Sequence, residues 1–175
     1  MIAVLGSQLD EINNFLKNVK TKGVCEVAND NADGQIIISG NVESINDLKN
    51  TLKENKKKFI PLNVSAPFHC SLMKPAAQRM EAIIDKTVFK NPSTDLVSNV
   101  TAEPTRDSKK IKSLLIKQIF SKVRWRESVM FMIEKGVDEF IEIGPGKVLS
   151  GLVKRISDKV SSKSINSIED IKSLK

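Results

Sequence analysis

The chain has 175 residues, of which 40% are hydrophobic, 28% charged and 5% aromatic, and its formal net charge is +7. This length allows one sizeable core or two small ones, but no apolar run approaches the roughly 20 residues that span a bilayer. The start also lacks the charged-then-apolar pattern of a secretory signal, so we expect a cytoplasmic protein without membrane contact.

The basic charge does not predict nucleic-acid binding. Lysine outnumbers arginine, the lysines are spread along the chain, and tyrosine is absent. Proteins that bind nucleic acids favour arginine and exposed aromatic side chains that stack on bases. The tight cluster at residues 56–58 is typical of a solvated turn. A dispersed basic surface would instead attract an acidic protein or a phosphorylated ligand.

The first 64 residues predict the element order β-α-β-β-α-β. Ser7 to Asp10 resembles a capping box at the start of the first helix, and Asn41 is a favoured N-cap for the second. Residues 29–34 are rich in Asn, Asp and Gly, which predicts a turn. The expected strands cover residues 2–5, 24–28, 35–39 and 59–64. This order is that of a ferredoxin-like split βαβ unit.

Residues 65–175 are expected to form part of a larger α/β domain. Gly144-Pro145-Gly146 turns the chain into a helix, and we interpret it as a structural turn because it matches neither phosphate-binding fingerprint. Cys25 and Cys70 lie in no metal-ligand spacing, and we expect them to stay reduced. The expected helices cover residues 72–84, 108–120, 126–134, 147–155 and a short stretch from 167, and the expected strands cover 96–100, 140–143 and a stretch near 164.

His69 is the only histidine of the chain and lies between the strand-like run 59–64 and the helix that opens at Leu72. A strand-to-helix junction can hold a side chain rigidly and still leave it accessible. A lone histidine is more often structural than catalytic, so its role depends on its neighbours.

Four segments in the same order resemble motifs of the malonyl-CoA:acyl carrier protein transacylase family. The segment around His69 reads Pro-Phe-His-Cys-Ser-Leu-Met-Lys-Pro-Ala and is similar to the histidine motif of that family. The four segments cover residues 28–40, 66–76, 117–125 and 142–152. The resemblance implies a ferredoxin-like small subdomain at 1–64, followed at 65–175 by the C-terminal part of an α/β-hydrolase-like acyltransferase domain.

The chain contains no Gly-x-Ser-x-Gly, the segment that carries the nucleophilic serine in that family. Ser150 lacks the preceding glycine and is expected inside a helix. The chain therefore resembles the C-terminal portion of a transacylase, and we expect this portion to be inactive alone.

The resemblance implies roles for three residues. His69 would be the general base that takes the proton of the serine, and Gln118 would orient it through its backbone carbonyl. Phe68 would line the acyl pocket, where a phenyl ring fills the space that an α-methyl group would need. Gln118 can also be read as a surface residue of a helix, and Phe68 as a core residue. Cys70 is not expected to replace the serine, because adjacent residues of an extended segment point to opposite sides.

The implied reaction is transfer of malonyl from malonyl-CoA to acyl carrier protein in type II fatty acid synthesis. It needs no cofactor and no metal, and its partners are the coenzyme A thioester and the carrier protein, with a monomer expected for the complete enzyme. The alternative is a non-catalytic ferredoxin-like module that binds a carrier or another protein. An acyltransferase domain of a polyketide synthase is a third possibility, disfavoured by the compact ending and the absence of a linker.

Overall fold

The computed structural model describes residues 1–173, and these form two compact units. The first unit runs from Met1 to Ser128, and the second begins at Val129. No helix among the described residues is long and apolar enough to cross a membrane. The predicted division into a small subdomain at 1–64 and part of a larger one at 65–175 stays a prediction.

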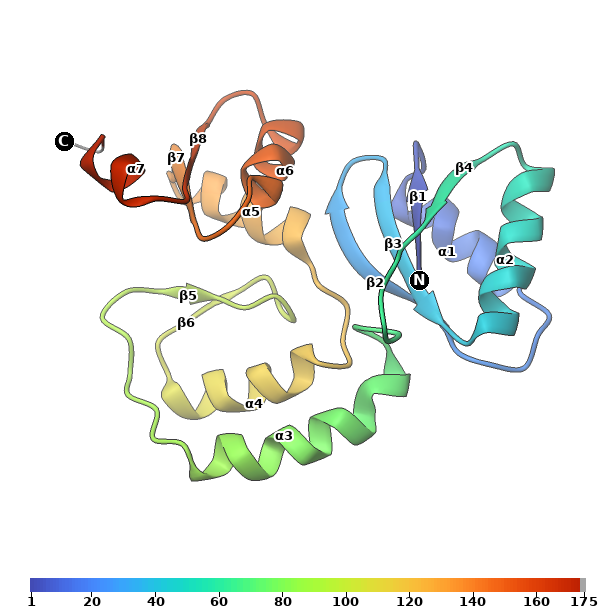
Figure 1. The fold of residues 1–175 in the computed structure, drawn as a ribbon, viewed down its shortest axis with the longest axis horizontal. Coiled ribbons are helices and arrows are strands. Elements are labelled where there is room, and N and C mark those ends of the chain that lie inside the picture. Colours follow the sequence, from blue (N-terminus) through green and yellow to red (C-terminus); the bar gives the residue numbers. More distant parts are fainter. Residues whose placement is uncertain (174–175) are drawn as a thin grey trace. The chain divides into compact units, whose positions relative to one another are not determined.

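The first unit opens with a four-stranded sheet and two helices (Figure 1). The sheet order is β2-β3-β1-β4, and all three pairings are antiparallel. The predicted β-α-β-β-α-β order is confirmed. The elements are β1 (Ile2–Leu5), α1 (Leu9–Lys17), β2 (Cys25–Ala32), β3 (Gln35–Gly40), α2 (Val42–Glu54) and β4 (Lys58–Pro61).

The main core lies between this sheet and the helices α1 and α2. Alternate residues of β1 and β3 point to the helices, since successive side chains of a strand face opposite sides. The helices contribute apolar residues at helical spacing, as the sequence pattern predicts. The fully or almost fully buried members are Ile2, Val4, Ile12, Ile36, Ile38, Ile45, Leu48 and Leu52. A smaller cluster of Ala3, Ala28 and Ile37 occupies the other face.

Strand β2 is longer than predicted. It continues through residues 29–32, which were expected to form a turn, and it pairs with β3 as far as Ala32. Two register shifts interrupt this pairing, so the Asn- and Asp-rich segment is accommodated as an irregular, bulged strand. The turn itself is shorter and contains Gly34, whose φ is +71°. The carbonyl of Gly34 accepts a hydrogen bond from Gly6 N–H at 2.8 Å.

Of the two predicted helix caps, the position of Asn41 is confirmed and the capping box at Ser7 is not. The N-cap of α1 is Gln8 and makes no side-chain cap bond, so the capping box predicted from Ser7 is wrong. Asn41 is the N-cap of α2, but its side chain accepts from Val24 N–H at 2.7 Å and not from the helix. Asn41 thus anchors the start of β2 to the start of α2.

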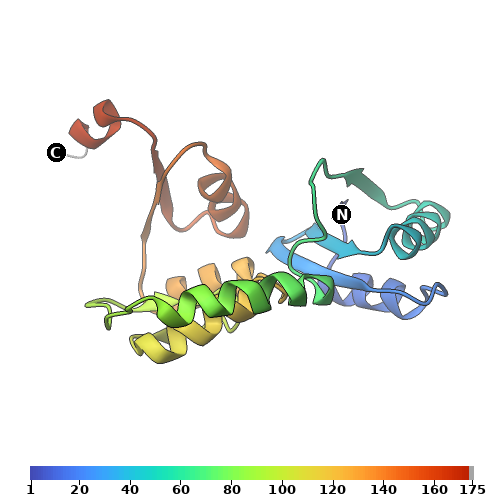
Figure 2. The same cartoon turned by 60° about the horizontal axis from the view of Figure 1, so that its bottom comes forward.

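The rest of the first unit contains two long helices that lie alongside one another, α3 in green and α4 in yellow (Figure 2). Asp107 caps α4 by accepting the N–H of Lys109 at 2.9 Å. The short pair of strands includes β6, which the sequence did not predict. The elements are the 3-10 turn η1 (Ser71–Met73), α3 (Lys74–Lys86), β5 (Leu96–Val97), β6 (Pro104–Thr105), α4 (Ser108–Gln118) and α5 (Trp125–Glu134), which continues past Ser128.

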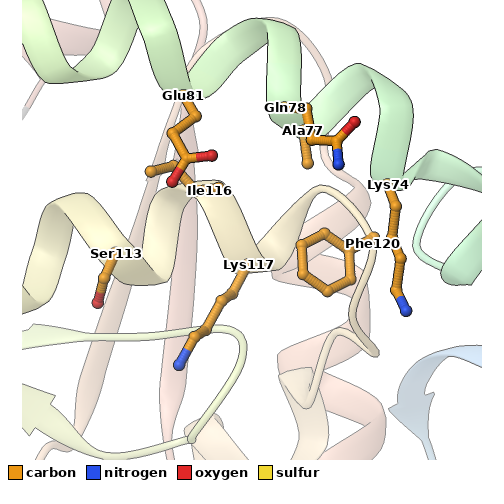
Figure 3. Close-up of a pocket in the computed structure, with 8 residues that line it drawn as sticks. All are labelled: Lys74, Ala77, Gln78, Glu81, Ser113, Ile116, Lys117 and Phe120. Atoms are coloured by element: carbon orange, nitrogen blue, oxygen red, sulfur yellow. The ribbon is translucent and has the colours of Figure 1, made fainter.

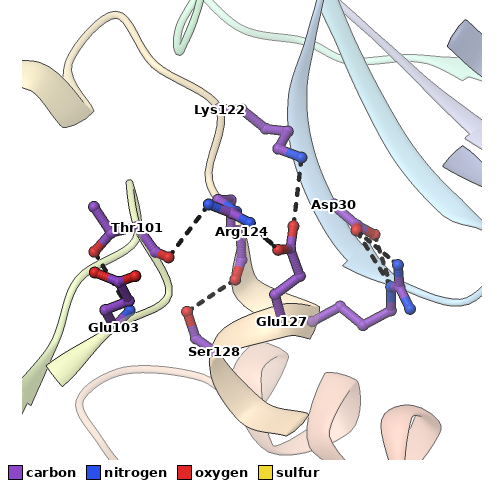
Figure 4. Close-up of polar contacts among 8 residues, drawn as sticks. Asp30, Thr101, Glu103, Lys122, Arg124, Glu127 and Ser128 are labelled. Carbon is purple, nitrogen blue, oxygen red and sulfur yellow. Dashed lines mark hydrogen bonds and ion pairs between the residues drawn. The ribbon is translucent and has the colours of Figure 1, made fainter. Parts of the chain in front are cut away.

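The segment before α5 is attached to the edge of β2. Asn29 and Val123 form a parallel bridge, with Asp30 N–H donating to Val123 O at 2.9 Å and Val123 N–H donating to Ala28 O at 2.8 Å. Beside this bridge, the fully buried carboxylate of Asp30 accepts three hydrogen bonds of 3.1 to 3.2 Å from Arg126 (Figure 4). These bonds raise the pKa of the Arg126 guanidinium.

The second unit contains a two-stranded parallel sheet and two short helices. The predicted strands near residues 140 and 164 pair with one another, Glu139 opposite Ser161 through Ile143 opposite Ile165. Ser167 caps the final helix in a capping box with Asp170. The elements are β7 (Glu139–Ile143), α6 (Val148–Ile156), β8 (Ser161–Ile165) and α7 (Ile168–Lys172).

Candidate functional site

His69 lies in the turn that joins β4 to η1, where a strand-to-helix junction was predicted. Its backbone has a φ of +59°, in the left-handed region that few residues other than glycine adopt. Such a conformation costs roughly 1–3 kcal/mol and persists where surrounding contacts enforce it. The turn is therefore held by its neighbours in a conformation that it would not adopt alone.

The imidazole of His69 is bonded to the end of helix α4. Its Nδ1 lies 2.9 Å from the backbone oxygen of Gln118, a residue 49 positions later in the chain. A carbonyl oxygen can only accept, so Nδ1 carries the proton in this contact. In the neutral ring Nε2 then keeps its lone pair and can accept a proton. The structure thus brings His69 and Gln118 together through the backbone, and leaves the amide of Gln118 out of the contact.

The residues on either side of His69 have different surroundings. Phe68 is 38% exposed and so does not belong to the core of the described residues. Cys70 is fully buried, and its thiol donates to Pro67 O at 3.1 Å. This bond closes the turn from inside and leaves Cys70 inaccessible as a nucleophile. Burial also raises the pKa of the other thiol, Cys25, to about 12, so Cys25 is a poor thiolate.

Strand β2 holds the turn from its other side. The carboxylate of Glu26 accepts the N–H of Ser71 at 2.9 Å and its hydroxyl at 2.5 Å. Glu26 was not predicted as a site residue. The available signal was a carboxylate in the middle of the predicted strand 24–28, which is otherwise apolar, so that a donor from elsewhere could be expected for it.

An open groove of about 330 Å³ separates α3 from α4 close to this turn (Figure 3). The α3 side contributes Lys74, Ala77, Gln78 and Glu81, and the α4 side contributes Ser113, Ile116, Lys117 and Phe120. Lys117 directly precedes Gln118, and Lys74 is the first residue of the helix that follows the histidine turn. The groove therefore combines the apolar side chains of Ala77, Ile116 and Phe120 with two lysines and one glutamate.

The Gly-Pro-Gly turn before α6 does not form an anion site. The carboxylate of Glu142 accepts the N–H groups of Ser150 at 2.7 Å and of Leu149 at 3.1 Å. These bonds, above all the one from Ser150, hold the pKa of Glu142 below its usual range. The helix start thus already has its own anion. The Ser150 hydroxyl is buried and donates to Lys163 O at 3.2 Å.

Among residues 1–173, no group of three or more His, Cys, Asp and Glu side chains is placed to hold a metal ion. At the His69 turn, the imidazole bonded through Nδ1 to the Gln118 carbonyl keeps Nε2 as a nitrogen that can accept or donate a proton.

A second set of polar contacts that the sequence analysis missed surrounds the start of α5 (Figure 4). Arg124 donates to Glu127 and to the backbone oxygen of Thr101 at 3.3 Å. The bond from Arg124 holds the pKa of Glu127 below its usual range. Asp30 and Arg126 belong to the same region. Asp30 was missed because residues 29–34 were predicted to form a turn, and Asp is common in turns for local reasons that need no counter-ion.

The known proteins that are similar to this chain in sequence or in structure are described as acyl carrier protein transacylases or malonyltransferases. No protein-family model matches it. A malonyl CoA-acyl carrier protein transacylase of Bacillus subtilis (strain 168) is 40% identical over 173 residues, 98% of this chain and 55% of that protein. The crystal structure of an acyl carrier protein S-malonyltransferase from Vibrio cholerae O1 biovar eltor str. N16961 superposes with a TM-score of 0.94 at 34% identity, covering 99% of this chain and 57% of that one.

A third similar structure is a malonyl-transacylase solved in complex with a type II PKS acyl-carrier protein. Its TM-score is 0.92 at 33% identity, and the match covers 98% of this chain and 56% of that one. The mixed α/β fold is thus shared with solved transacylases over nearly the whole of this chain. The chain is a homologue of the malonyl CoA-acyl carrier protein transacylases and spans little more than half of their length.

Proposed function

We propose that this chain supplies the histidine half of a malonyl-CoA:acyl carrier protein transacylase of type II fatty acid synthesis. The observation that carries the proposal is the 2.9 Å contact between His69 Nδ1 and the Gln118 carbonyl. It fixes one tautomer and leaves Nε2 as the nitrogen that can accept a proton, which is what a general base requires. The similarity to transacylases over 98% of the chain supports the same assignment.

The reaction proceeds in two steps with a serine that lies outside this chain. In the first, Nε2 of His69 accepts the serine proton while the serine oxygen attacks the malonyl thioester carbonyl. The thioester carbon–sulfur bond then breaks, and the protonated His69 gives its proton to the departing thiolate of coenzyme A. In the second, Nε2 of His69 accepts the proton of the phosphopantetheine thiol of the carrier protein while the thiol sulfur attacks the malonyl-serine carbonyl. The carbon–oxygen bond to the serine then breaks, and His69 gives that proton to the serine oxygen.

Within the same proposal, residues 1–64 are the ferredoxin-like small subdomain and residues 65–175 the C-terminal part of an α/β-hydrolase-like subdomain. The antiparallel order β2-β3-β1-β4 supports the first assignment. Phe68 lines the acyl pocket beside His69, and its 38% exposure leaves its ring free to contact an acyl group.

The partners are a coenzyme A thioester and an acyl carrier protein, and neither cofactor nor metal takes part. The net charge of +7 would attract the phosphates of both substrates and an acidic carrier. The complete enzyme is proposed to be monomeric and cytoplasmic. The rival proposal, a non-catalytic module, does not account for a strained histidine bonded to Gln118.

The test joins this chain to the part of the Bacillus subtilis transacylase that it does not match. We expect the fusion to transfer malonyl to its carrier, and His69→Ala to lower the rate by about 10³-fold or more, near the upper end for a general base. The melting temperature should change little. The 175-residue chain alone should remain unlabelled by radioactive malonyl-CoA after denaturation, since the proposed serine is absent. A folded fusion with near-normal turnover after His69→Ala would contradict the role of His69.

A further inference from the structure

The turn that carries His69 is held by two elements that are remote from it in sequence. Helix α4 contributes the Gln118 carbonyl, which accepts from the His69 ring. Strand β2 contributes the Glu26 carboxylate, which accepts both the N–H and the hydroxyl of Ser71. The ring of His69 is therefore anchored on one side and the backbone two residues later on the other.

The contacts within the turn are weaker restraints. The Cys70 thiol bonds Pro67 O, and Met73 N–H bonds Cys70 O at 3.0 Å. A thiol is a weak donor, whereas a hydrogen bond to an ionised carboxylate is roughly twice as strong as one between neutral groups. The positive φ of His69 needs such enforcement, because a histidine gains stability by relaxing out of the left-handed region.

Glu26 matches its two donors in number and charge. An ionised carboxylate has two oxygens that only accept hydrogen bonds. Here Oε2 of Glu26 accepts the N–H of Ser71, and Oε1 accepts its hydroxyl. The strand that carries Glu26 is itself fixed by pairing with β3, where Glu26 lies opposite the fully buried Ser39. The pairing of β2 with β3 thus fixes the position of Glu26, and Glu26 in turn fixes the position of Ser71.

We propose that Glu26 is a positioning residue for His69 and acts through Ser71. By fixing Ser71 it keeps His69 in the left-handed conformation, and only in that conformation does Nδ1 reach the Gln118 carbonyl. Glu26 does not touch the reacting atoms. The proposal rests on the proposed function in taking His69 as the base, but its test reads the histidine directly and needs no turnover.

The experiment measures the tautomer of His69 by ¹⁵N NMR of the whole 175-residue chain. His69 is the only histidine, so its ring signals need no assignment. The spectra are recorded at a pH above which the ring signals no longer change, so that the two nitrogens report which one carries the proton of the neutral ring. We expect the unaltered chain to show the proton on Nδ1. Glu26→Gln should shift the ring toward the mixture of tautomers found in free histidine, because the amide nitrogen cannot accept from Ser71.

Asp47→Asn is the matched control. Its carboxylate likewise accepts the N–H and the hydroxyl of one residue, Thr21, both at 3.1 Å, and also the N–H of Lys20 at 2.7 Å. This control should destabilise the unit comparably and leave the His69 tautomer unchanged. Ser71→Ala is the second variant, since it removes only the hydroxyl and should shift the tautomer less than Glu26→Gln.

The proposal is overturned if the tautomer of His69 is the same in Glu26→Gln as in Asp47→Asn. If Glu26→Gln does not fold, an unchanged tautomer in folded Ser71→Ala overturns it instead. A fusion enzyme without transfer activity would contradict the proposed function, whereas the NMR result would still decide the role of Glu26.

Discussion

Replacing Arg126 by Met should destabilise the first unit by about 3 kcal/mol. The Asp30 carboxylate is fully buried and Arg126, 24% exposed, is its partner in three hydrogen bonds. Removing one partner of a buried pair typically costs about 3–5 kcal/mol, because the other charge stays buried without compensation. The partial exposure of Arg126 lets water approach the site, which places the expected loss at the lower end.

The assay is thermal and urea unfolding followed by circular dichroism. For a chain of this size, a loss of about 3 kcal/mol lowers Tm by about 6–12 °C, at roughly 2–4 °C per kcal/mol. The matched control is Arg106→Met, which breaks the pair with Asp95, whose side chains are 58% and 56% exposed. Exposed pairs contribute about 0–1 kcal/mol, so this variant should melt close to the unaltered chain.

A double variant separates the loss of the pair from the loss of packing. Asp30→Leu combined with Arg126→Met removes both charges, and buried pairs can often be replaced by apolar residues at little cost. We therefore expect the double variant to recover most of the stability lost in Arg126→Met. Two results would contradict this reasoning: a Tm of Arg126→Met equal to that of Arg106→Met, or a double variant that is less stable than Arg126→Met. Either would show that Arg126 does not stabilise the unit by compensating the buried charge of Asp30.

Three further predictions address the turn, the pH dependence and the acyl pocket. His69→Gly should be more stable than His69→Ala by about 1 kcal/mol in urea unfolding, because both lose the bond to Gln118 but only glycine adopts a φ of +59° without strain; equal stability would contradict the strain. The folded-state pKa of Glu127 is held below its ordinary value by Arg124, so its stabilisation is fully present above about pH 4.3 and is lost as the pH falls through the lowered value. Glu127→Gln should therefore be less stable than the unaltered chain at pH 7 and approach it in acid, and a difference that is constant with pH would contradict this assignment. In the fusion enzyme, Phe68→Ser should raise the ratio of kcat/KM for methylmalonyl-CoA to that for malonyl-CoA by about 10–100-fold, and an unchanged ratio in a folded variant would remove Phe68 from the acyl pocket.

The sequence patterns predicted most elements well because apolar periodicity and packing agree. The alternation of Ile2 and Val4, and the spacing of Ile45, Leu48 and Leu52, follow directly from which face is buried. One error falls where pairing between strands overrides a local preference for a turn. Residues 29–32 were expected in a turn because Asn and Asp favour turns locally, yet pairing with β3 keeps them in a strand.

The site was predictable to different degrees. The His69–Gln118 contact was expected only through resemblance to the transacylases, since no local pattern relates residues 49 positions apart. Glu26 was missed because a single carboxylate in a strand does not reveal its donor. The roles of His69, Gln118 and Phe68 remain predictions, and their geometry adds a strained turn that no residue pattern indicated.

The attachment of Val123 to β2 also bears on how the edges of the four-stranded sheet could pair with another chain. The strand order makes β2 and β4 the two edges of the sheet, where unpaired backbone groups can recruit another chain. On β2, the bridge to Val123 uses backbone N–H and C=O groups that an added strand would need. Two register shifts in the pairing with β3 also make the strand irregular. The other edge, β4, has only four residues, begins with an exposed lysine and ends in a proline. Amyloid-like stacking therefore has no flat template in this sheet, even though isoleucines fill its centre.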